Sequence, residues 1–176
     1  MRFLPLPDSA LWHRLIEDRH PLLVDAAVAL SAVTRPLAVT ALSLVVAALL
    51  AWRWRPVLVL PLSVIAAGLV GHALKPVIGR ERPPEEFRLV VETNHAMPSG
   101  HATGMAALAM VLTLWWWPRG GWWRLPVAGV WVLAVTVSWT RLYLGVHWFS
   151  DVLAGLILGG AVAFLVAEAT KRLTLS

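Results

Sequence analysis

The chain has 176 residues, 59% of them hydrophobic, and contains no cysteine. Its mean hydropathy of +0.71 is too high for a water-soluble domain, and the lack of thiols excludes a disulfide framework and a thiolate metal site. The formal net charge of +5 comes from basic residues at the ends of apolar runs. Because they form no continuous basic stripe, we expect a membrane protein with no nucleic-acid partner.

The N-terminal segment, residues 1–35, precedes the long apolar runs. Residues 1–20 contain Asp8, Arg14 and Glu17 and no apolar core, which argues against a cleavable signal peptide. Residues 20–34 are apolar on one side, but they are few and Asp25 interrupts them. We interpret the segment as amphipathic and interfacial, with a sixth, imperfect membrane span at 20–34 as the alternative.

Five later runs are apolar and long enough for transmembrane helices, which need about 20 residues each. They are predicted near residues 36–52, 56–74, 99–117, 122–139 and 150–167. Arg53 and Arg55 separate the first two runs, and a Pro-Arg-Gly-Gly turn at 118–121 separates the third from the fourth. The sequence therefore predicts an all-α polytopic membrane helix bundle of five to six transmembrane helices. We expect a single domain, 1–176, with its transmembrane core at 36–172.

Charged loops fall on two sides of this bundle if consecutive spans alternate in direction. One side collects Arg53, Arg55, Arg119, Arg124, Lys171 and Arg172. The other collects three polar clusters, described below, and Glu81, Glu85, Glu86 and Glu92. Since short loops rich in lysine and arginine favour the cytoplasm, we place the first side and the C-terminus there. We therefore expect a protein integral to the cytoplasmic membrane (the inner or plasma membrane), with the polar clusters on its extracytoplasmic face.

Two further patterns concern packing. Gly155, Gly159 and Gly160 give the last span a stripe of small residues, along which a neighbouring helix can approach closely. We expect that neighbour within the same chain rather than in a dimer, and leave a homo-oligomer open. Tryptophans crowd the turn at 118–121, where indole rings favour the headgroup layer and would anchor the bundle.

The first polar cluster lies at the end of the second span, from Lys75 to Arg82 and Pro83. Arginine offers a rigid fork for paired phosphate oxygens, and lysine supplies a mobile point charge. Basic residues at span ends usually only extend to the interface, so this cluster alone predicts little.

The second cluster is Pro-Ser-Gly-His at 98–101, immediately before an apolar helix. Ser99 can cap that helix, and Gly100 lets its free backbone N–H groups approach an anion. His101, in the first turn, could donate a proton to a departing oxygen. An ordinary helix cap with a hydrogen-bonded histidine is the competing interpretation.

The third cluster joins the fourth and fifth spans and contains Arg141, His147 and Asp151. If the segment is helical, the spacing of four places the imidazole and the carboxylate on one surface. Asp151 would then hold the Nδ1 proton and leave Nε2 of His147 as a nucleophile. A local His–Asp pair at a helix start is the simpler alternative.

Taken together, the three clusters resemble the type 2 phosphatidic acid phosphatase superfamily, membrane lipid phosphatases related to vanadium haloperoxidases. That family shows Lys, six residues, Arg-Pro; then Pro-Ser-Gly-His; then Ser-Arg, five residues, His, three residues, Asp. The chain has the same residues in the same order and spacing, with one departure, Thr140 in place of serine.

The resemblance implies that His147 attacks phosphorus, Asp151 orients His147, and His101 protonates the leaving oxygen. It also implies that the phosphoryl oxygens are held by Lys75, Arg82, Ser99, Gly100 and Arg141. Neither a metal nor another cofactor is expected, because three cations can neutralise the phosphoryl oxygens. The active site would thus be built from residues 75–151.

A site at the ends of membrane helices suits a lipid whose phosphate enters a polar pocket while its tails stay in the bilayer. The family suggests polyprenyl diphosphates, phosphatidylglycerol phosphate and phosphatidic acid, and the sequence does not choose among them. The apolar spans argue against a soluble haloperoxidase relative, because they would expose too much apolar surface to water.

Two other functions stay open at this point. A metal-dependent membrane hydrolase could use His95, His101, His147, Asp151 and Glu85 as ligands, although the nearby cations would repel a metal. A non-enzymatic lipid carrier could bind a headgroup with the same basic residues, although it would need openings on both faces of the membrane.

Overall fold

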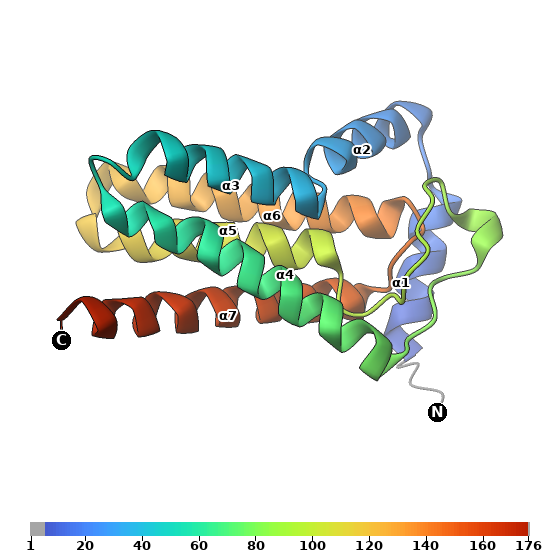
Figure 1. Ribbon diagram of the computed structural model, residues 1–176. Coiled ribbons are helices and arrows are strands. Elements are labelled where there is room, and N and C mark those ends of the chain that lie inside the picture. The colour runs from blue at the N-terminus through green and yellow to red at the C-terminus, as the bar shows by residue number, and fades with distance from the viewer. Residues whose placement is uncertain (1–5, 176) are drawn as a thin grey trace.

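The computed structural model describes residues 6–175, and the regular structure in them is entirely helical. The α-helices are α1 Leu6–Glu17, α2 Pro21–Val33, α3 Pro36–Leu50, α4 Val59–Ile78, α5 Gly100–Trp116, α6 Arg124–Tyr143 and α7 Phe149–Leu175. Short 3₁₀ helices are η1 Arg55–Leu58, η2 Glu85–Phe87, η3 Trp117–Arg119 and η4 Gly121–Trp123. In Figure 1, α3 to α7 run along a common direction, and α1 lies across one end. The predicted all-α bundle is confirmed for these residues.

Each of the five predicted runs falls on a helix. Three stretches are long and apolar enough to cross a membrane: Arg55–Ile78, Gly121–Tyr143 and Phe149–Arg172. The pair α2 and α3, bent by 49° at their junction, makes a fourth if it counts as one broken span. Helix α5 has 17 residues. It is thus about 25 Å long, slightly less than the roughly 30 Å hydrocarbon core. The described residues therefore hold three or four candidate spans, and the number five to six stays a prediction.

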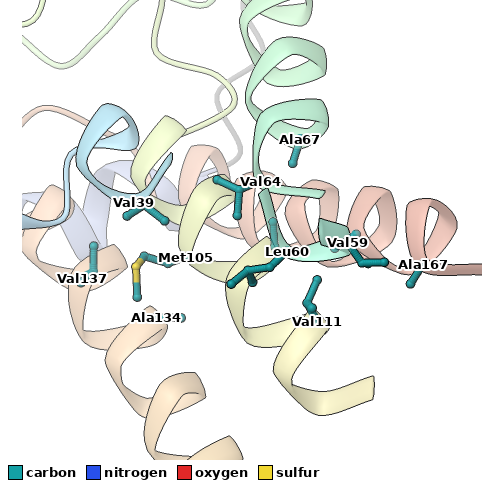
Figure 2. Packing of buried hydrophobic residues seen from close by; sticks show 12 residues of the cluster. Val39, Val59, Leu60, Val64, Ala67, Met105, Val111, Ala134, Val137 and Ala167 are labelled. Atoms are coloured by element: carbon teal, nitrogen blue, oxygen red, sulfur yellow. The ribbon is translucent and has the colours of Figure 1, made fainter. Parts of the chain in front are cut away.

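Helix α5 lies at the centre of the bundle and packs against α4, α6 and α7. The buried cluster around it contains Val39 of α3, Val64 of α4, Met105 of α5, Val137 of α6 and Ala167 of α7. Figure 2 shows these side chains converging from the five helices. Because α5 is surrounded, its N-terminus with the Pro-Ser-Gly-His cluster lies among the ends of its neighbours.

The stripe of small residues on α7 packs within the chain, and the structure shows that its neighbour is α5. A Cβ atom on Gly155 would lie 2.7 Å from the Ser99 carbonyl oxygen. One on Gly159 would overlap the Thr103 carbonyl oxygen and lie 2.9 Å from its carbon. The two backbones therefore touch along this contact, which fixes how far α7 can slide along α5.

Helix α4 ends about one turn later than the sequence predicted. It passes Lys75, tolerates Pro76 in its last turn and ends at Gly79, whose φ of 61° closes the helix. Lys75 is consequently held in the last turn of the helix, with its side chain only 7% exposed.

The three polar clusters all meet at one end of the bundle. The C-terminal ends of α4 and α6 and the N-terminal ends of α5 and α7 lie there, beside α1 and the long connection 79–99 (Figure 1). The turns that contain Arg53, Arg55, Arg119 and Arg124 lie at the opposite end. This separation agrees with the alternation of loops inferred from the sequence.

Candidate active site

A cavity of about 250 Å³ lies at the end of the bundle where the clusters meet. Five of the predicted site residues line it: Lys75, Arg82, Gly100, His101 and His147. They come from α4, the 79–99 connection, α5 and the loop before α7. The fold thus brings residues more than 70 positions apart to one hollow, where these predicted residues supply two cations and two imidazoles.

The same cavity continues along the helices, away from the charged end. Its walls there are Thr40 of α3, Val64 and Gly68 of α4, and Gly104 of α5. Val64 precedes Lys75 by 11 residues, which is about 16 Å along a helix. The cavity therefore joins a polar end to a long, mostly apolar section between α3, α4 and α5.

His147 is fully buried and its two ring nitrogens have different partners. Nδ1 lies 3.3 Å from Oδ2 of Asp151. Nε2 lies 3.3 Å from Nη1 of Arg82. A guanidinium can only donate, so Nε2 must accept and carry no proton, and the ring proton must be on Nδ1, facing the carboxylate. This is the tautomer in which the Nε2 lone pair can act as a nucleophile.

The electrostatics at His147 favour the same neutral form. Burial lowers the pKa of the imidazole well below its ordinary value, and the charges of Arg82, Arg141 and Lys75 lower this pKa further. A neutral ring amid three cations can bind an anion without first losing a proton.

The sequence offered a helical His–Asp pair as the reason for this contact, and the structure differs. His147 lies in the loop, and α7 begins only at Phe149. Asp151, in the first turn of α7, accepts the backbone N–H of Trp148 at 2.8 Å through the same Oδ2 that faces His147. The carboxylate therefore holds the loop and the imidazole together at the helix start.

Arg141 and Arg82 are joined by a residue that the motif analysis did not single out, Glu92. Arg141 donates through Nη2 to Oε1 of Glu92, and Nη2 of Arg82 lies 3.4 Å from Oε2. Glu92 lines the cavity, whereas Arg141 lies behind it and is 1% exposed. An anionic group thus already bridges two of the proposed phosphate-binding cations. Thr140, the departure from the family pattern, donates to the Val137 carbonyl at 2.7 Å.

His101 is held by Ser31 on α2. Its Nε2 lies 3.1 Å from the Ser31 carbonyl oxygen and 3.4 Å from the Ser31 hydroxyl, which also accepts a hydrogen bond from Nη1 of Arg141. Helix α2 therefore contributes directly to the geometry of the site. Because this contact joins residues 70 positions apart, no spacing in the sequence indicates it.

Ser99 is at the N-cap position of α5, but its side chain makes no capping hydrogen bond. The prediction of a serine side-chain cap was wrong. The backbone N–H of Ser99 donates to the Asp151 carbonyl at 3.0 Å, which turns the residue toward α7. Its hydroxyl oxygen is buried and has no hydrogen-bond partner among the described residues, so it remains available to an additional ligand.

Lys75 donates to the backbone carbonyl of His95 at 2.7 Å, which links α4 to the 79–99 connection. Arg82 is tied to the same connection through Asn94, whose side-chain oxygen lies 2.6 Å from Nη2. Among residues 6–175, no group of three or more histidine or acidic side chains has an arrangement suited to a metal ion. The ligand set considered for a metallohydrolase is thus not assembled in this arrangement.

Comparisons with known proteins place the chain in a family. The family model described as the PAP2 superfamily matches residues 56–174. An undecaprenyl-diphosphatase of Sulfolobus acidocaldarius is 38% identical over 80 residues, 43% of this chain and 34% of that protein. A lipid A 4'-phosphatase of Bacteroides thetaiotaomicron is 32% identical over 111 residues, 57% of this chain and 47% of that protein. The chain thus matches about a third to a half of the length of these relatives.

A solved structure has the same fold. The crystal structure of a transmembrane PAP2-type phosphatidylglycerolphosphate phosphatase from Bacillus subtilis matches with a TM-score of 0.82 and 24% identity, covering 94% of this chain and 85% of that one. Together with the candidate spans, these similarities identify an integral membrane protein. Because the family model covers more than half of the chain and includes all three polar clusters, the chain belongs to the PAP2 superfamily.

Proposed function

We propose that the protein is a phosphatase of membrane lipids, which removes phosphate from a lipid phosphate monoester or diphosphate through a phosphohistidine intermediate. The observation that supports this best is the cavity lined by His147 at its polar end. At this end the Nε2 lone pair of the neutral imidazole faces Arg82, one of the cations of the cavity. The adjoining apolar section of the cavity is suited to a lipid tail.

In the first step, Nε2 of His147 attacks phosphorus and the bond from phosphorus to the leaving oxygen breaks. Asp151 stabilises the positive charge that develops on the ring, because its Oδ2 faces the Nδ1 proton. His101 protonates the departing oxygen of the lipid alcohol or lipid phosphate. Because Nε2–H of His101 donates to the Ser31 carbonyl, the transferable proton is on Nδ1 of the doubly protonated ring, so His101 must take up this proton before the step and the leaving oxygen is expected at Nδ1.

In the second step, water attacks phosphorus, the bond between phosphorus and Nε2 breaks, and inorganic phosphate leaves. Nδ1 of His101, which lost its proton in the first step, takes the proton of the water, and His147 returns to its neutral form. Lys75, Arg82 and Arg141 neutralise the phosphoryl oxygens in both steps, and the Gly100 backbone and the free Ser99 hydroxyl add hydrogen bonds. Three fixed cations thereby take the place that magnesium has in many phosphoryl transfers, so the proposal includes no metal.

The relatives indicate the substrate class. They are described as acting on undecaprenyl diphosphate, lipid A and phosphatidylglycerolphosphate. For this chain we propose a polyprenyl diphosphate, phosphatidylglycerol phosphate or phosphatidic acid. We further propose that the site faces away from the cytoplasm, with the C-terminus inside, because the arginine-rich turns lie at the opposite end of the bundle.

The decisive test is phosphate release by the purified protein in detergent, from a panel of lipid phosphates and diphosphates, with and without a chelator. We expect His147→Ala and His101→Ala to abolish turnover of every substrate, and the chelator to have no effect on the unmodified protein. A His147→Ala variant that still releases phosphate would exclude the phosphohistidine. Lipid transfer without phosphate release would favour the carrier.

Arg82→Lys tests the geometry of the cations. The substitution keeps the charge but loses the fork that contacts Asn94, Glu92 and His147. We expect kcat/KM to fall by an amount equivalent to about 2 kcal/mol or more in transition-state stabilisation. A loss equal to that of Arg82→Ala would show that shape matters as much as charge, and unchanged kinetics would contradict a direct role for the guanidinium.

A further inference from the structure

Next to the cavity lies a buried ionic cluster that joins Asp151 to two residues without a part in the proposed mechanism, Arg80 and Asp8. At its centre is Arg80, on the connection between α4 and α5, two positions before Arg82. Nη1 of Arg80 lies 2.9 Å from Oδ1 of Asp151, and Nη2 lies 2.8 Å from Oδ2 of Asp8 on α1. Asp8 is 3% exposed and Asp151 is fully buried, so a single arginine bridges two carboxylates that water barely reaches.

The two oxygens of Asp151 have different partners. Oδ2 faces the His147 ring and the Trp148 backbone, as described above. Oδ1 makes no well-aligned hydrogen bond with any residue that the structure describes, and its contact is the ion pair with Arg80. Without Arg80, that oxygen would be a buried charge with no partner, and the carboxylate would be free to rotate away from the imidazole.

Arg80 is itself held in place by α1 and α7. Oδ1 of Asp8 accepts the backbone N–H of Ser150 at 2.9 Å, and Oδ2 of Asp8 also accepts the Ser150 hydroxyl. Burial would raise the pKa of Asp8, but hydrogen bonds from Ser150 and Arg80 outweigh it and leave this pKa below its usual value. Asp8 is therefore an anion that fastens α1 to the first turn of α7 and to Arg80.

Arg80 does not line the cavity that holds His147, whereas Lys75 and Arg82 do. It contacts the reacting groups only through Asp151. From this arrangement we propose that Arg80 is a positioning residue for the His147–Asp151 pair, and that Asp8 of α1 is the anchor of Arg80. This inference rests on the proposed function, and it makes the N-terminal helix part of the catalytic apparatus.

The proposal predicts a defect in kcat rather than in substrate binding. In Arg80→Gln the cations that contact phosphate are unchanged, so KM should stay within about threefold of the unmodified protein. The carboxylate loses its second partner and the imidazole its orientation, so kcat should fall on the order of 10- to 100-fold. Asp8→Asn, which only loosens the anchor, should lower kcat in the same direction by less.

Chemical rescue separates positioning from a general structural role. In Arg80→Ala, added guanidinium ion can occupy the vacated place between the two carboxylates, and it should restore part of kcat in a saturable manner. Arg14→Ala and Asp18→Asn, both at exposed positions in or next to α1, are the matched controls. Neither should change kcat or respond to guanidinium.

The outcomes are distinguishable. Unchanged kcat in Arg80→Gln, or a defect confined to KM, would overturn the positioning role. The proposed function would still hold in that case, provided that His147→Ala is inactive. Phosphate release by His147→Ala would instead refute the proposed function itself. If Arg80→Ala does not fold, as judged by thermal unfolding in detergent, then Arg80→Lys and Asp8→Asn decide: a kcat loss with unchanged KM supports the proposal, and normal kinetics contradict it.

Discussion

Glycines line two regions of this bundle and have opposite roles there. Along α7, Gly155 and Gly159 touch the backbone of α5, and a Cβ atom at either position would collide with it. Along the cavity, Gly68 of α4 and Gly104 of α5 have nothing within 4 Å of where a Cβ atom would be. The first pair lets two helices meet, and the second pair leaves space between them.

The tightly packed region and the open region have different parts in the proposed function. The tight contact holds the beginnings of α5 and α7 together, where the Ser99 backbone donates to the Asp151 carbonyl. The Asp151 carboxylate therefore lies on the tightly packed side of the molecule. The open side, between α3, α4 and α5, is where the proposed lipid tail would lie. Within the proposed function, rigid packing positions the reacting groups and empty space admits the substrate.

The strongest test of this contrast is a single methyl group added on each side. Gly159→Ala should destabilise the protein by about 2 kcal/mol or more, because the methyl group meets backbone atoms that cannot move aside. Gly68→Ala should be neutral or stabilising by up to about 1 kcal/mol, since its methyl group enters open space and alanine favours helix. Thermal unfolding of both variants in one detergent measures the difference. Equal stabilities would contradict the tight contact.

A larger side chain on the open side should affect substrate choice and leave the fold intact. Gly68 precedes Lys75 by seven residues, about 10 Å along α4. A leucine there would fill the apolar section and leave the polar end free. We expect Gly68→Leu to lower kcat/KM for long-chain lipid phosphates about tenfold or more, and to change hydrolysis of a small soluble phosphate ester less than about twofold.

Gly129→Leu on α6 is the matched control for that substitution. Gly129 also has nothing within 4 Å of its Cβ position, but it does not line the cavity. Both kinds of substrate should be hydrolysed normally by this variant. If Gly68→Leu impaired the lipid and the soluble ester alike, the apolar section would have no special relation to the tail.

How far the sequence predicted these regions depends on the range of the interactions. The spans at 56–74, 122–139 and 150–167 could be located because apolar length is a local property. The glycine stripe on α7 predicted a close helix contact, within the chain or in a dimer, because small residues at helical spacing let two backbones approach. Only the structure shows that the helix packed against this stripe is α5.

The candidate site shows the same limit. The clusters around Lys75, His101 and His147 are recognisable in the sequence because their spacing is fixed. Ser31 and Glu92 are not recognisable in this way. Ser31 contacts His101 only because α2 bends away from α3 and packs against α6, and Glu92 meets Arg141 only because the 79–99 connection lines the cavity. No pattern in the local sequence indicates either contact.

The smallest expected effect concerns Glu92, at the polar end of the cavity on the open side. Its carboxylate bridges Arg141 and Arg82, so a phosphoryl group that takes the same donors must displace it and is repelled by its charge. Glu92→Gln keeps the shape and removes the charge. Because the side chain is 25% exposed, solvent screens the repulsion, and we expect inorganic phosphate to bind only about threefold more tightly. Inhibition of turnover by phosphate measures the effect, with Glu86→Gln on the exposed η2 helix as the control. Weaker inhibition in Glu92→Gln than in the unmodified protein would mean that the carboxylate chiefly holds the two arginines in place and does not compete with the substrate for them.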